Sequence, residues 1–205
     1  MKRLVIIGAS GHGKVVADIA KKNGYGEIVF LDDNENLNEC DGYSVVGKSS
    51  DSYNYSCDVF VAIGNANIRK KIQEELVAKG HHVPVLIHPN AVIGENVKIG
   101  DGTVVMAGAV INACTLIGKG CIINTCSSVD HDCRISDYVH ISVGAHLAGT
   151  VRIGEKTWIG IGALVSNNVD ICEHCMIGAG AVVIKNIDKI GTYIGVPARV
   201  MSDEE

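Results

Sequence analysis

The hydrophobic positions in the second half of the chain recur every six residues. Stepping by six from Ile87, each position as far as Val183 holds Ile, Leu or Val. These positions are Ile87, Ile93, Ile99, Val105, Ile111, Ile117, Ile123, Val129, Ile135, Ile141, Leu147, Ile153, Ile159, Val165, Ile171, Ile177 and Val183. A period of six fits neither a helix of about 3.6 residues per turn nor a hairpin meander. The pattern therefore predicts a parallel β-solenoid in which three hexads form one triangular coil.

A coil of three hexads places residues eighteen positions apart in one column. A small or β-branched residue follows most of the aliphatic positions by four, and we expect it to face inward as well. One such predicted column contains Cys121, Val139, Thr157 and Cys175. Glycine and asparagine between the hexads supply the positive φ angles that tight turns require.

The first part of the chain follows a different pattern. An apolar strand, a glycine-rich turn and an amphipathic helix are expected within 3–25, and a second strand within 27–34. Strand, glycine turn and helix are expected again within 57–80. This alternation predicts a small parallel sheet flanked by helices. We expect two domains, an α/β Rossmann-like domain over 1–83 and an all-β solenoid domain over 84–205, with Pro84 and Pro89 at the transition.

Composition excludes several classes of function. The chain has 205 residues, 47% hydrophobic and 20% charged, which is sufficient for a packed core. A formal charge of -5 without basic clusters argues against a nucleic-acid partner. No apolar run approaches the roughly 20 residues that span a membrane, and the N-terminus resembles a first strand rather than a signal peptide. We expect a cytoplasmic protein, in which the eight cysteines behave as small apolar residues.

Two short motifs invite chemical interpretations. Cys172 and Cys175 form a C-x-x-C that would suit a redox pair or half a zinc site, but no second C-x-x-C accompanies it, and we expect no bound metal. The first glycine turn, "GASGHG", opens a helix after the first strand and could meet an anion or a sugar hydroxyl. Asp32 and Asp33 follow about twenty residues later, where acidic side chains bind ribose. A tight turn followed by a solvated strand end would produce the same pattern.

The repeat resembles that of the hexapeptide acyltransferases, which have a left-handed parallel β-helix. The segments "IIGASGHGKVVADIA", "FLDD", "AIGN", "VDHDC" and "IGVPARV" together resemble the PglD/NeuD group of bacterial sugar acetyltransferases, most closely its bacillosamine-pathway members. The resemblance covers nearly the whole chain. It implies a homotrimer with active sites between subunits, acetyl-CoA as co-substrate, and acetylation of the 4-amino group of a nucleotide-linked, UDP-type amino-sugar for surface glycans or glycoproteins.

The resemblance also assigns roles to individual residues. His131 matches the general base of the family, and Asp132 matches the acidic neighbour that orients the imidazole and raises its basicity. The expected acetyl-CoA contacts are His140, Gly149, Ile161 and Ala179, with the Gly149 amide a candidate oxyanion donor. The family position that His140 matches contacts either the substrate or CoA from the neighbouring subunit, and the sequence leaves both open. The expected nucleotide-sugar contacts are Ser10, Gly11, His12, Asp32, Asp33 and Gly64, with His12 near phosphate.

Three other functions remain open at the level of sequence. A sialic acid or polysaccharide O-acetyltransferase would use the same base against a hydroxyl group. A β-helix carbonic anhydrase would bind zinc through three histidines, but the spacing of His131, His140 and His146 does not match that family. A noncatalytic sensor of sugar nucleotides would consume no thioester.

Overall fold

The computed structural model describes residues 1–201 of the chain. It contains two compact units, Met1–Pro89 and Asn90–Glu205. The domains 1–83 and 84–205 stay a prediction, and the last four residues of the second one lie outside the described residues. Within 1–201 no helix is long and apolar enough to cross a membrane.

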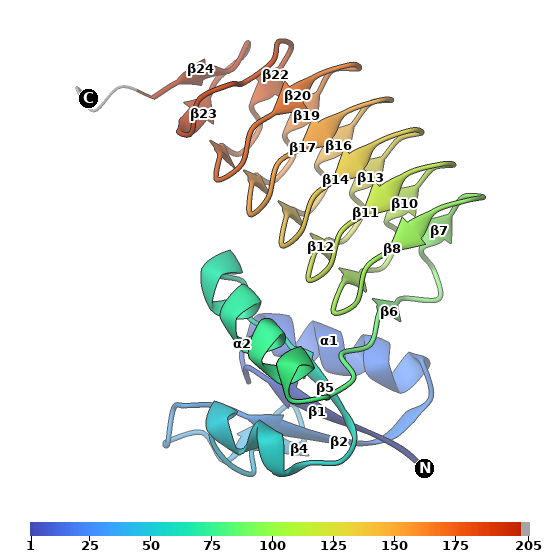
Figure 1. Cartoon of the computed structure of the whole chain (residues 1–205), viewed down its shortest axis with the longest axis vertical. Helices are drawn as coiled ribbons and strands as arrows, with labels where there is room; N and C mark the ends of the chain where they lie inside the picture. Colours follow the sequence, from blue (N-terminus) through green and yellow to red (C-terminus); the bar gives the residue numbers. More distant parts are fainter. Residues whose placement is uncertain (202–205) are drawn as a thin grey trace. The chain divides into compact units, whose positions relative to one another are not determined.

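The N-terminal unit is a small parallel sheet with helices (Figure 1). Its three main strands are ordered β2-β1-β5 and all run parallel, as the alternation of strands and helices predicted. In chain order its elements are β1 (Lys2–Ile7), α1 (Gly11–Lys22), β2 (Tyr25–Leu31), β3 (Glu39–Cys40), β4 (Tyr43–Ser44), the 3-10 helix η1 (Ser49–Asn54), β5 (Asp58–Val61), α2 (Ala66–Ala78) and β6 (Leu86–Ile87).

The central strand β1 is apolar because both of its faces are covered. Its four residues from Leu4 to Ile7 are completely buried, which is typical of a parallel sheet between helices. Helix α1 passes close to the end of β1, and this approach requires glycine at position 13. A Cβ at Gly13 would overlap the carbonyl oxygen of Gly8. Asn65 caps the N-terminus of helix α2, because its side chain accepts hydrogen bonds from the backbone N–H groups of Asn67 and Ile68.

The C-terminal unit is the predicted parallel β-solenoid (Figure 1). Its strands are β7 (Val92–Ile93), β8 (Lys98–Ile99), β9 (Val104–Val105), β10 (Val110–Ile111), β11 (Leu116–Ile117), β12 (Ile122–Ile123), β13 (Ser128–Val129), β14 (Arg134–Ile135), β15 (His140–Ile141), β16 (His146–Leu147), β17 (Arg152–Ile153), β18 (Trp158–Ile159), β19 (Leu164–Val165), β20 (Asp170–Ile171), β21 (Met176–Ile177), β22 (Val182–Val183), β23 (Thr192–Ile194) and β24 (Arg199–Val200). The last two form an antiparallel pair.

The solenoid has three faces, each a ladder of every third strand. We call the ladder β7, β10, β13, β16, β19, β22 the first face, and β8, β11, β14, β17, β20 the second face. The third face contains β9, β12, β15, β18, β21 and the final pair β23 and β24. From β7 to β22, partners within a face are eighteen residues apart, as in Ile111 and Val129, so the predicted register is confirmed for these strands.

The interior is filled as the six-residue pattern requires. The second residue of each strand from β9 to β22 is buried, and these are the aliphatic positions of the repeat. The predicted inward column of Cys121, Val139, Thr157 and Cys175 is at most 2% exposed. The polar member keeps its hydrogen bonds, because the Thr157 hydroxyl donates to the Cys172 carbonyl and accepts from the Cys175 N–H.

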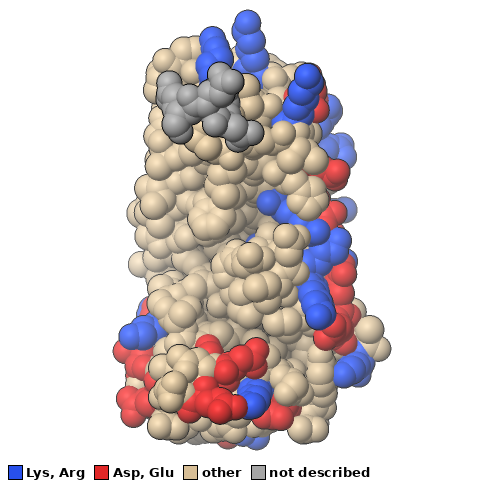
Figure 2. Space-filling model, turned by 90° about the vertical axis from the view of Figure 1, so that its left-hand side faces the viewer, with Lys and Arg blue, Asp and Glu red and all other residues tan. Residues whose placement is uncertain are grey.

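The three faces differ in the side chains that point outward. The first residue of a strand faces outward when the second faces inward, because side chains alternate along a strand. On the second face these residues are Lys98, Leu116, Arg134, Arg152 and Asp170. On the first face, and on the third as far as β21, the corresponding described positions hold no Asp, Glu, Lys or Arg. Figure 2 shows a broad surface nearly free of charge, with cations and anions along its edge.

Candidate functional site

His131 lies in the turn between β13 and β14, where the first face meets the second. His131 is two residues after Val129, the inward-facing aliphatic residue of β13, and so falls outside the inward columns. Its side chain is 58% exposed. Its neighbour Asp132 has the left-handed φ of 59°, a conformation that Asp and Asn tolerate better than most residues. The turn therefore presents the imidazole on the surface of the solenoid.

Carboxylates on both sides hold His131 in place. The Asp132 Oδ2 atom lies 2.8 Å from His131 Nδ1, and Asp130 Oδ1 accepts the backbone N–H of His131 at 2.8 Å. Asn112, one coil earlier, donates to the same Asp130 oxygen at 2.7 Å. The hydrogen bond from Asp132 and the charges of both carboxylates raise the pKa of His131 above its ordinary value, although desolvation opposes them.

Gly149 lies directly against the imidazole, one coil later in the same column. An added Cβ at Gly149 would lie 2.6 Å from His131 Nε2 and 2.7 Å from Cε1, so only glycine leaves this ring position free. The residue is buried. Within 1–201 no backbone acceptor takes the Gly149 N–H, whereas the next amide, that of Thr150, donates to the His131 carbonyl at 2.9 Å. A backbone donor is therefore available beside Nε2.

The nearest cysteine in sequence is not part of this surface. Cys133 points inward, as its place in the repeat predicted, and is completely buried. Its thiol donates to the Ala148 carbonyl at 3.3 Å. Burial raises the pKa of Cys133, which disfavours the thiolate that a nucleophilic cysteine needs.

His140 lies on the third face, in strand β15, and is partly buried. Its Nε2 is 3.0 Å from Asn124 Nδ2, and its ring centroid is 4.7 Å from that of Trp158. Ile161, in the turn between the third and first faces, is 62% exposed, and Ala179 occupies the same turn position one coil later and is exposed too. Of the four expected acetyl-CoA residues, Gly149 thus lies at the His131 corner, whereas Ile161 and Ala179 lie at another corner of the prism and His140 lies on the third face.

The expected nucleotide-sugar residues converge in the N-terminal unit. Ser10 and Gly11 begin α1 after β1, the two aspartates follow β2, and Gly64 follows β5, so all lie at the carboxyl ends of parallel strands. This edge is where open α/β sheets bind ligands. Asp32 ties the segments together, because its Oδ2 accepts the N–H of Ala9 at 2.7 Å.

The two aspartates differ in their contacts. Asp32 uses both carboxylate oxygens for the chain itself, since Oδ1 also accepts the N–H of Asn34 at 2.9 Å. Asp33 uses Oδ1 to accept the N–H of Ser49 at 2.9 Å, and no protein donor within 1–201 contacts its Oδ2. Asp33 is therefore the one with an oxygen available to a ligand.

A buried arginine accompanies His12 at the same edge. Arg69 is 1% exposed and donates from one nitrogen to the carbonyl oxygens of Ile63 at 2.7 Å and Gly64 at 2.8 Å. Burial, reinforced by the charge of Arg69, lowers the pKa of His12 to about 4. The Nε2 atom of His12 is shielded from solvent without a partner among residues 1–201. His12 is therefore a neutral imidazole at pH 7 with a free polar atom.

Several residues that shape the site were not selected from the sequence. Asn112 and Asp130 are eighteen residues apart, as are His140 and Trp158, so the column rule could have paired them. The contact between Arg69 and the turn after β5 could not be found this way, because it depends on how α2 packs.

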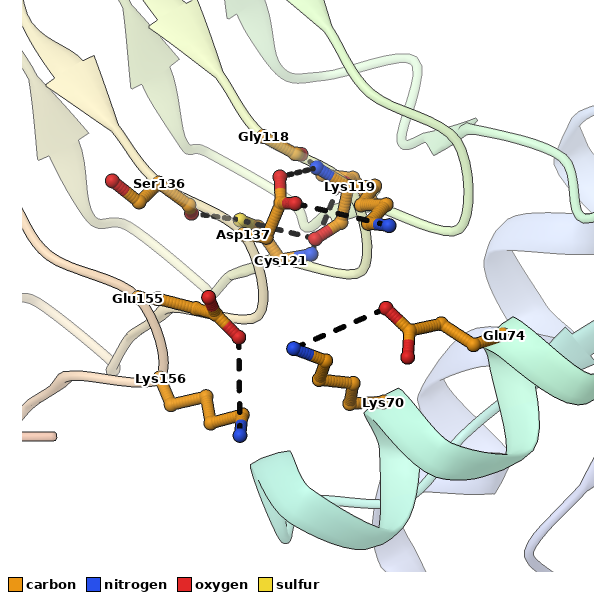
Figure 3. Close-up of polar contacts among 10 residues, drawn as sticks. Lys70, Glu74, Gly118, Lys119, Cys121, Ser136, Asp137, Glu155 and Lys156 are labelled. Carbon is orange, nitrogen blue, oxygen red and sulfur yellow. Dashed lines mark hydrogen bonds and ion pairs between the residues drawn. The ribbon is translucent and has the colours of Figure 1, made fainter. Parts of the chain in front are cut away.

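Polar clusters elsewhere on the solenoid make ordinary surface contacts. At the corner between the second and third faces, Asp137 accepts the N–H of Lys119 at 2.9 Å, and Glu155 lies 3.8 Å from the Lys156 ammonium (Figure 3). These residues are only partly buried, and ion pairs that water can reach contribute little to stability. Among residues 1–201 no three His, Cys, Asp or Glu side chains are grouped to hold a metal ion, and Cys172 and Cys175 lie with their sulfur atoms 3.4 Å apart as free thiols.

The fold places the chain in a defined class. The family model "Bacterial transferase hexapeptide (six repeats)" matches residues 84–113 and 150–185, so the solenoid is that of the hexapeptide transferases. The family model "PglD N-terminal domain" matches residues 3–76. Together with the relatives below, these matches show that the chain belongs to the PglD-like hexapeptide sugar acetyltransferases.

The chain is similar over its whole length to solved structures. The acetyltransferase domain of PglB from Neisseria gonorrhoeae FA1090, in complex with acetyl coenzyme A, is 44% identical with a TM-score of 0.95, covering 98% of this chain and 99% of that one. PerB from Caulobacter crescentus, in complex with CoA and GDP-perosamine, is 35% identical with a TM-score of 0.92, covering 98% of each chain.

The curated relatives match over shorter stretches. The UDP-N-acetylbacillosamine N-acetyltransferase of Bacillus subtilis (strain 168) is 38% identical over 113 residues, which are 52% of this chain and 52% of the relative. The chain thus matches about half the length of the curated relatives.

Proposed function

We propose that the protein transfers the acetyl group of acetyl-CoA directly to the 4-amino group of a UDP-linked amino-deoxysugar, with His131 as general base, in the synthesis of surface glycans or glycoproteins. The observation that carries the proposal is the pairing of His131 with Asp132 at 2.8 Å beside the open amide of Gly149. The relatives support it, because solved ones bind acetyl-CoA, or CoA with a nucleotide-linked amino-sugar.

The chemistry requires one base and one oxyanion donor. The amine nitrogen attacks the thioester carbonyl, and the resulting tetrahedral intermediate carries a negative oxygen and a proton to be lost. His131 Nε2 accepts that proton, because Nδ1 is held by Asp132. The C–S bond then breaks, CoA leaves as a thiolate that takes up a proton, and the sugar carries a new amide.

Gly149 fits the second role. Gly149 packs against the imidazole, and no backbone acceptor among residues 1–201 takes its N–H, so this N–H is our candidate donor to the oxygen that becomes negative. Transfer through a cysteine acyl-enzyme is not supported by the geometry, because Cys133 is buried with a raised pKa. The proposal is therefore direct transfer within a ternary complex.

The N-terminal unit would bind the nucleotide. The start of α1 offers backbone N–H groups to a diphosphate, and His12 offers a neutral imidazole nitrogen without a partner in the described chain. Asp33 retains a carboxylate oxygen for a ribose or base donor. A UDP sugar is proposed because the paired aspartates resemble those of bacillosamine-pathway members, whereas the solved relative from Caulobacter crescentus binds a GDP sugar.

The solenoid faces support a homotrimer. The outward rows of the first face, and of the third as far as β21, carry no charged side chain among the described residues, and they expose Trp158, Leu164 and Met176 by 37–43%. Two further copies of this chain are the proposed occupants, which would bring the His131 corner of one subunit to the Ile161 corner of the next. Sedimentation equilibrium of the purified protein tests this assembly. The cytoplasmic location stays a prediction.

The deciding experiment is CoA release from acetyl-CoA against a panel of acceptors. The panel contains UDP- and GDP-linked 4-amino-sugars, free sialic acid and polysialic acid, with zinc content measured on the same preparation. Turnover with a UDP 4-amino-sugar supports the proposal, and turnover with the GDP sugar alone would change the nucleotide. Turnover with sialic acid alone would support O-acetylation. No CoA release with any acceptor, together with stoichiometric zinc, would favour the carbonic anhydrase. No CoA release and no zinc would favour the noncatalytic sensor.

His131→Ala is the matched variant for this assay. Turnover should fall by about 10² to 10⁴-fold, the usual contribution of a general base, with the oligomeric state unchanged. Full turnover of the variant would remove His131 from the mechanism.

A further inference from the structure

Four side chains on the third face form a continuous series of contacts. Asn124, His140, Ser142 and Trp158 come from, or directly follow, the adjacent strands β12, β15 and β18. Asn124 contacts the His140 imidazole, which stacks against the Trp158 indole, whose N–H donates to the Ser142 hydroxyl at 2.6 Å. None of these contacts involves His131, so the series is distinct from the proposed base.

The first contact fixes which nitrogen of His140 carries the proton. Asn124 Oδ1 accepts the backbone N–H of Thr125 at 2.8 Å, so the amide nitrogen is the atom that faces the imidazole. An amide nitrogen only donates, and it lies 3.0 Å from His140 Nε2. Nε2 must therefore accept, and neutral His140 carries its proton on Nδ1.

The second contact fixes the plane of the imidazole. His140 and Trp158 are directly paired residues of neighbouring strands, with ring centroids 4.7 Å apart and planes tilted by 34°. The final torsion of a histidine is broad and roughly two-fold, so the hydrogen bond to Asn124 alone leaves the ring free to tilt. Stacking against the indole removes that freedom.

The third contact holds the indole itself. Ser142 is 2% exposed, and its hydroxyl accepts the Trp158 N–H. The indole remains 37% exposed, on the same side of the solenoid as the turn that carries Ile161. Its polar edge is therefore anchored inside the protein while part of the ring meets solvent.

We propose that Trp158 is a positioning residue of the acetyl-CoA site, which acts by holding the His140 imidazole in one orientation and is itself anchored by Ser142. The inference rests on the proposed contact between His140 and acetyl-CoA. It assigns roles to Trp158, Ser142 and Asn124 that the sequence motifs did not indicate.

The test is a double-mutant cycle on acetyl-CoA binding by the full-length protein. Affinity for acetyl-CoA is measured by calorimetry without an acceptor, for the wild type, Trp158→Ala, His140→Ala and the double variant. We expect Trp158→Ala to weaken binding by about 3- to 10-fold, the value of an aromatic pair. If Trp158 acts through His140, the double variant should bind no more weakly than His140→Ala.

Two milder variants keep the test valid where Trp158→Ala fails to fold. Trp158→Phe retains a stacking ring and should restore most of the affinity. Ser142→Ala retains both rings but releases the indole, and should weaken binding by about 2- to 10-fold, the range of one hydrogen bond. Leu116→Ala, in the outward row of the second face and away from the proposed subunit contacts, is the control and should change affinity little.

A spectroscopic readout separates positioning from general destabilisation. Trp158 is the only tryptophan of the chain, so its fluorescence reports on this contact alone. Removal of the imidazole changes the surroundings of the indole, so His140→Ala should alter the intensity or wavelength of the Trp158 emission. Met176→Ala should leave the contact between the two rings in place and should not reproduce the emission change of His140→Ala.

Three outcomes would overturn the inference. Unchanged affinity in Trp158→Ala would show that the indole is not needed, and additive losses in the cycle would show that it acts independently of His140. Unchanged affinity in His140→Ala would remove the contact on which the inference depends. The acceptor panel reports on acetyl transfer separately, so that result would not be confused with a failure of the proposed function.

Discussion

The α-carbon of Gly149 and the imidazole of His131 are in such close contact that no side chain fits between them. The two residues are eighteen positions apart and lie in adjacent coils of one corner, where a Cβ at Gly149 would approach His131 Nε2 to 2.6 Å. Two neighbours therefore determine the position of the proposed base. Asp132, in the same coil, holds the imidazole by a hydrogen bond, and Gly149, in the next coil, leaves room for it because it has no side chain.

Gly149→Ala should displace the imidazole without unfolding the solenoid. Because the added methyl group overlaps Nε2, the ring must rotate out of its hydrogen bond with Asp132. We expect turnover to fall by about 10²-fold or more, as for the loss of a positioned base. Steady-state kinetics of CoA release measure the loss, and circular dichroism checks the fold.

The clash can be tested by removing its other partner. In a His131→Ala background, Gly149→Ala has no ring to displace. The unfolding free energy that Gly149→Ala costs in the wild type should therefore largely be recovered in that background. An equal cost in both backgrounds would show that the contact between the two residues is not the cause.

Asp132→Asn should move the pH dependence of turnover to lower pH. The hydrogen bond that the Asp132 carboxylate accepts from His131 Nδ1 is the largest influence that raises the pKa of His131, and only the neutral imidazole accepts a proton. Removing the carboxylate lowers that pKa, so kcat/KM should rise at a more acidic pH, with a lower plateau because the weaker base is less effective. A pH profile of kcat/KM from about pH 5 to 9 measures the shift, and an unmoved acid limb would mean that another group titrates.

Asp33→Ala should weaken binding of the nucleotide sugar and leave acetyl-CoA affinity unchanged. Asp33 has a carboxylate oxygen without a protein donor in the described chain, so the loss should be about 10- to 150-fold, the value of a hydrogen bond to a charged group. Calorimetry with each ligand alone provides the measurement. Equal loss of both affinities would indicate misfolding.

Asp32→Ala should behave differently from Asp33→Ala. Asp32 accepts the part-buried N–H of Ala9 and so holds the turn after β1, whereas the Ser49 N–H that Asp33 accepts is exposed, so that water can replace the carboxylate there. We expect a loss of about 1–3 kcal/mol in unfolding free energy, which denaturant titration measures.

His12 should make the protein less stable in mild acid. Its pKa is about 4 in the folded protein against an ordinary value of 6.5, so between these values the unfolded chain binds a proton that the folded one does not. Stability is fully present above about pH 6.5 and falls as the pH is lowered towards about 4, by up to about 3 kcal/mol. Denaturant titrations at about pH 7 and about pH 4.5 measure the loss, which should shrink in His12→Gln.

The repeat made most of the solenoid predictable because two residues in every six must fill the interior of a triangular coil. The column that contains Cys121 and Thr157 follows from counting alone, and so do the strand partners eighteen residues apart. The N-terminal sheet was predictable from its alternating strands and helices. The sequence could not separate Asp32 from Asp33, because only the fold reveals which oxygens the backbone uses.

The site was predictable where a motif residue lies on a turn and unpredictable where contacts depend on side-chain direction. His131 and Asp132 are adjacent in sequence, and their pairing could be expected. The stacking of Trp158 on His140 needed both the column rule and the knowledge that both side chains point outward from the third face. The burial of Arg69 beside His12 depends on the packing of α2 and left no pattern in the sequence.

The eighteen-residue register limits how the length of this chain can change. Adding one whole coil within the solenoid would preserve which face each later strand joins, and would lengthen the prism by about 4.8 Å, one strand spacing. Adding a single hexad would instead advance every later strand by one face, so the charged row of the second face would replace an uncharged one. Viable length variants should therefore differ by whole coils between His131 and Ala179, and shorter insertions should be confined to the turns.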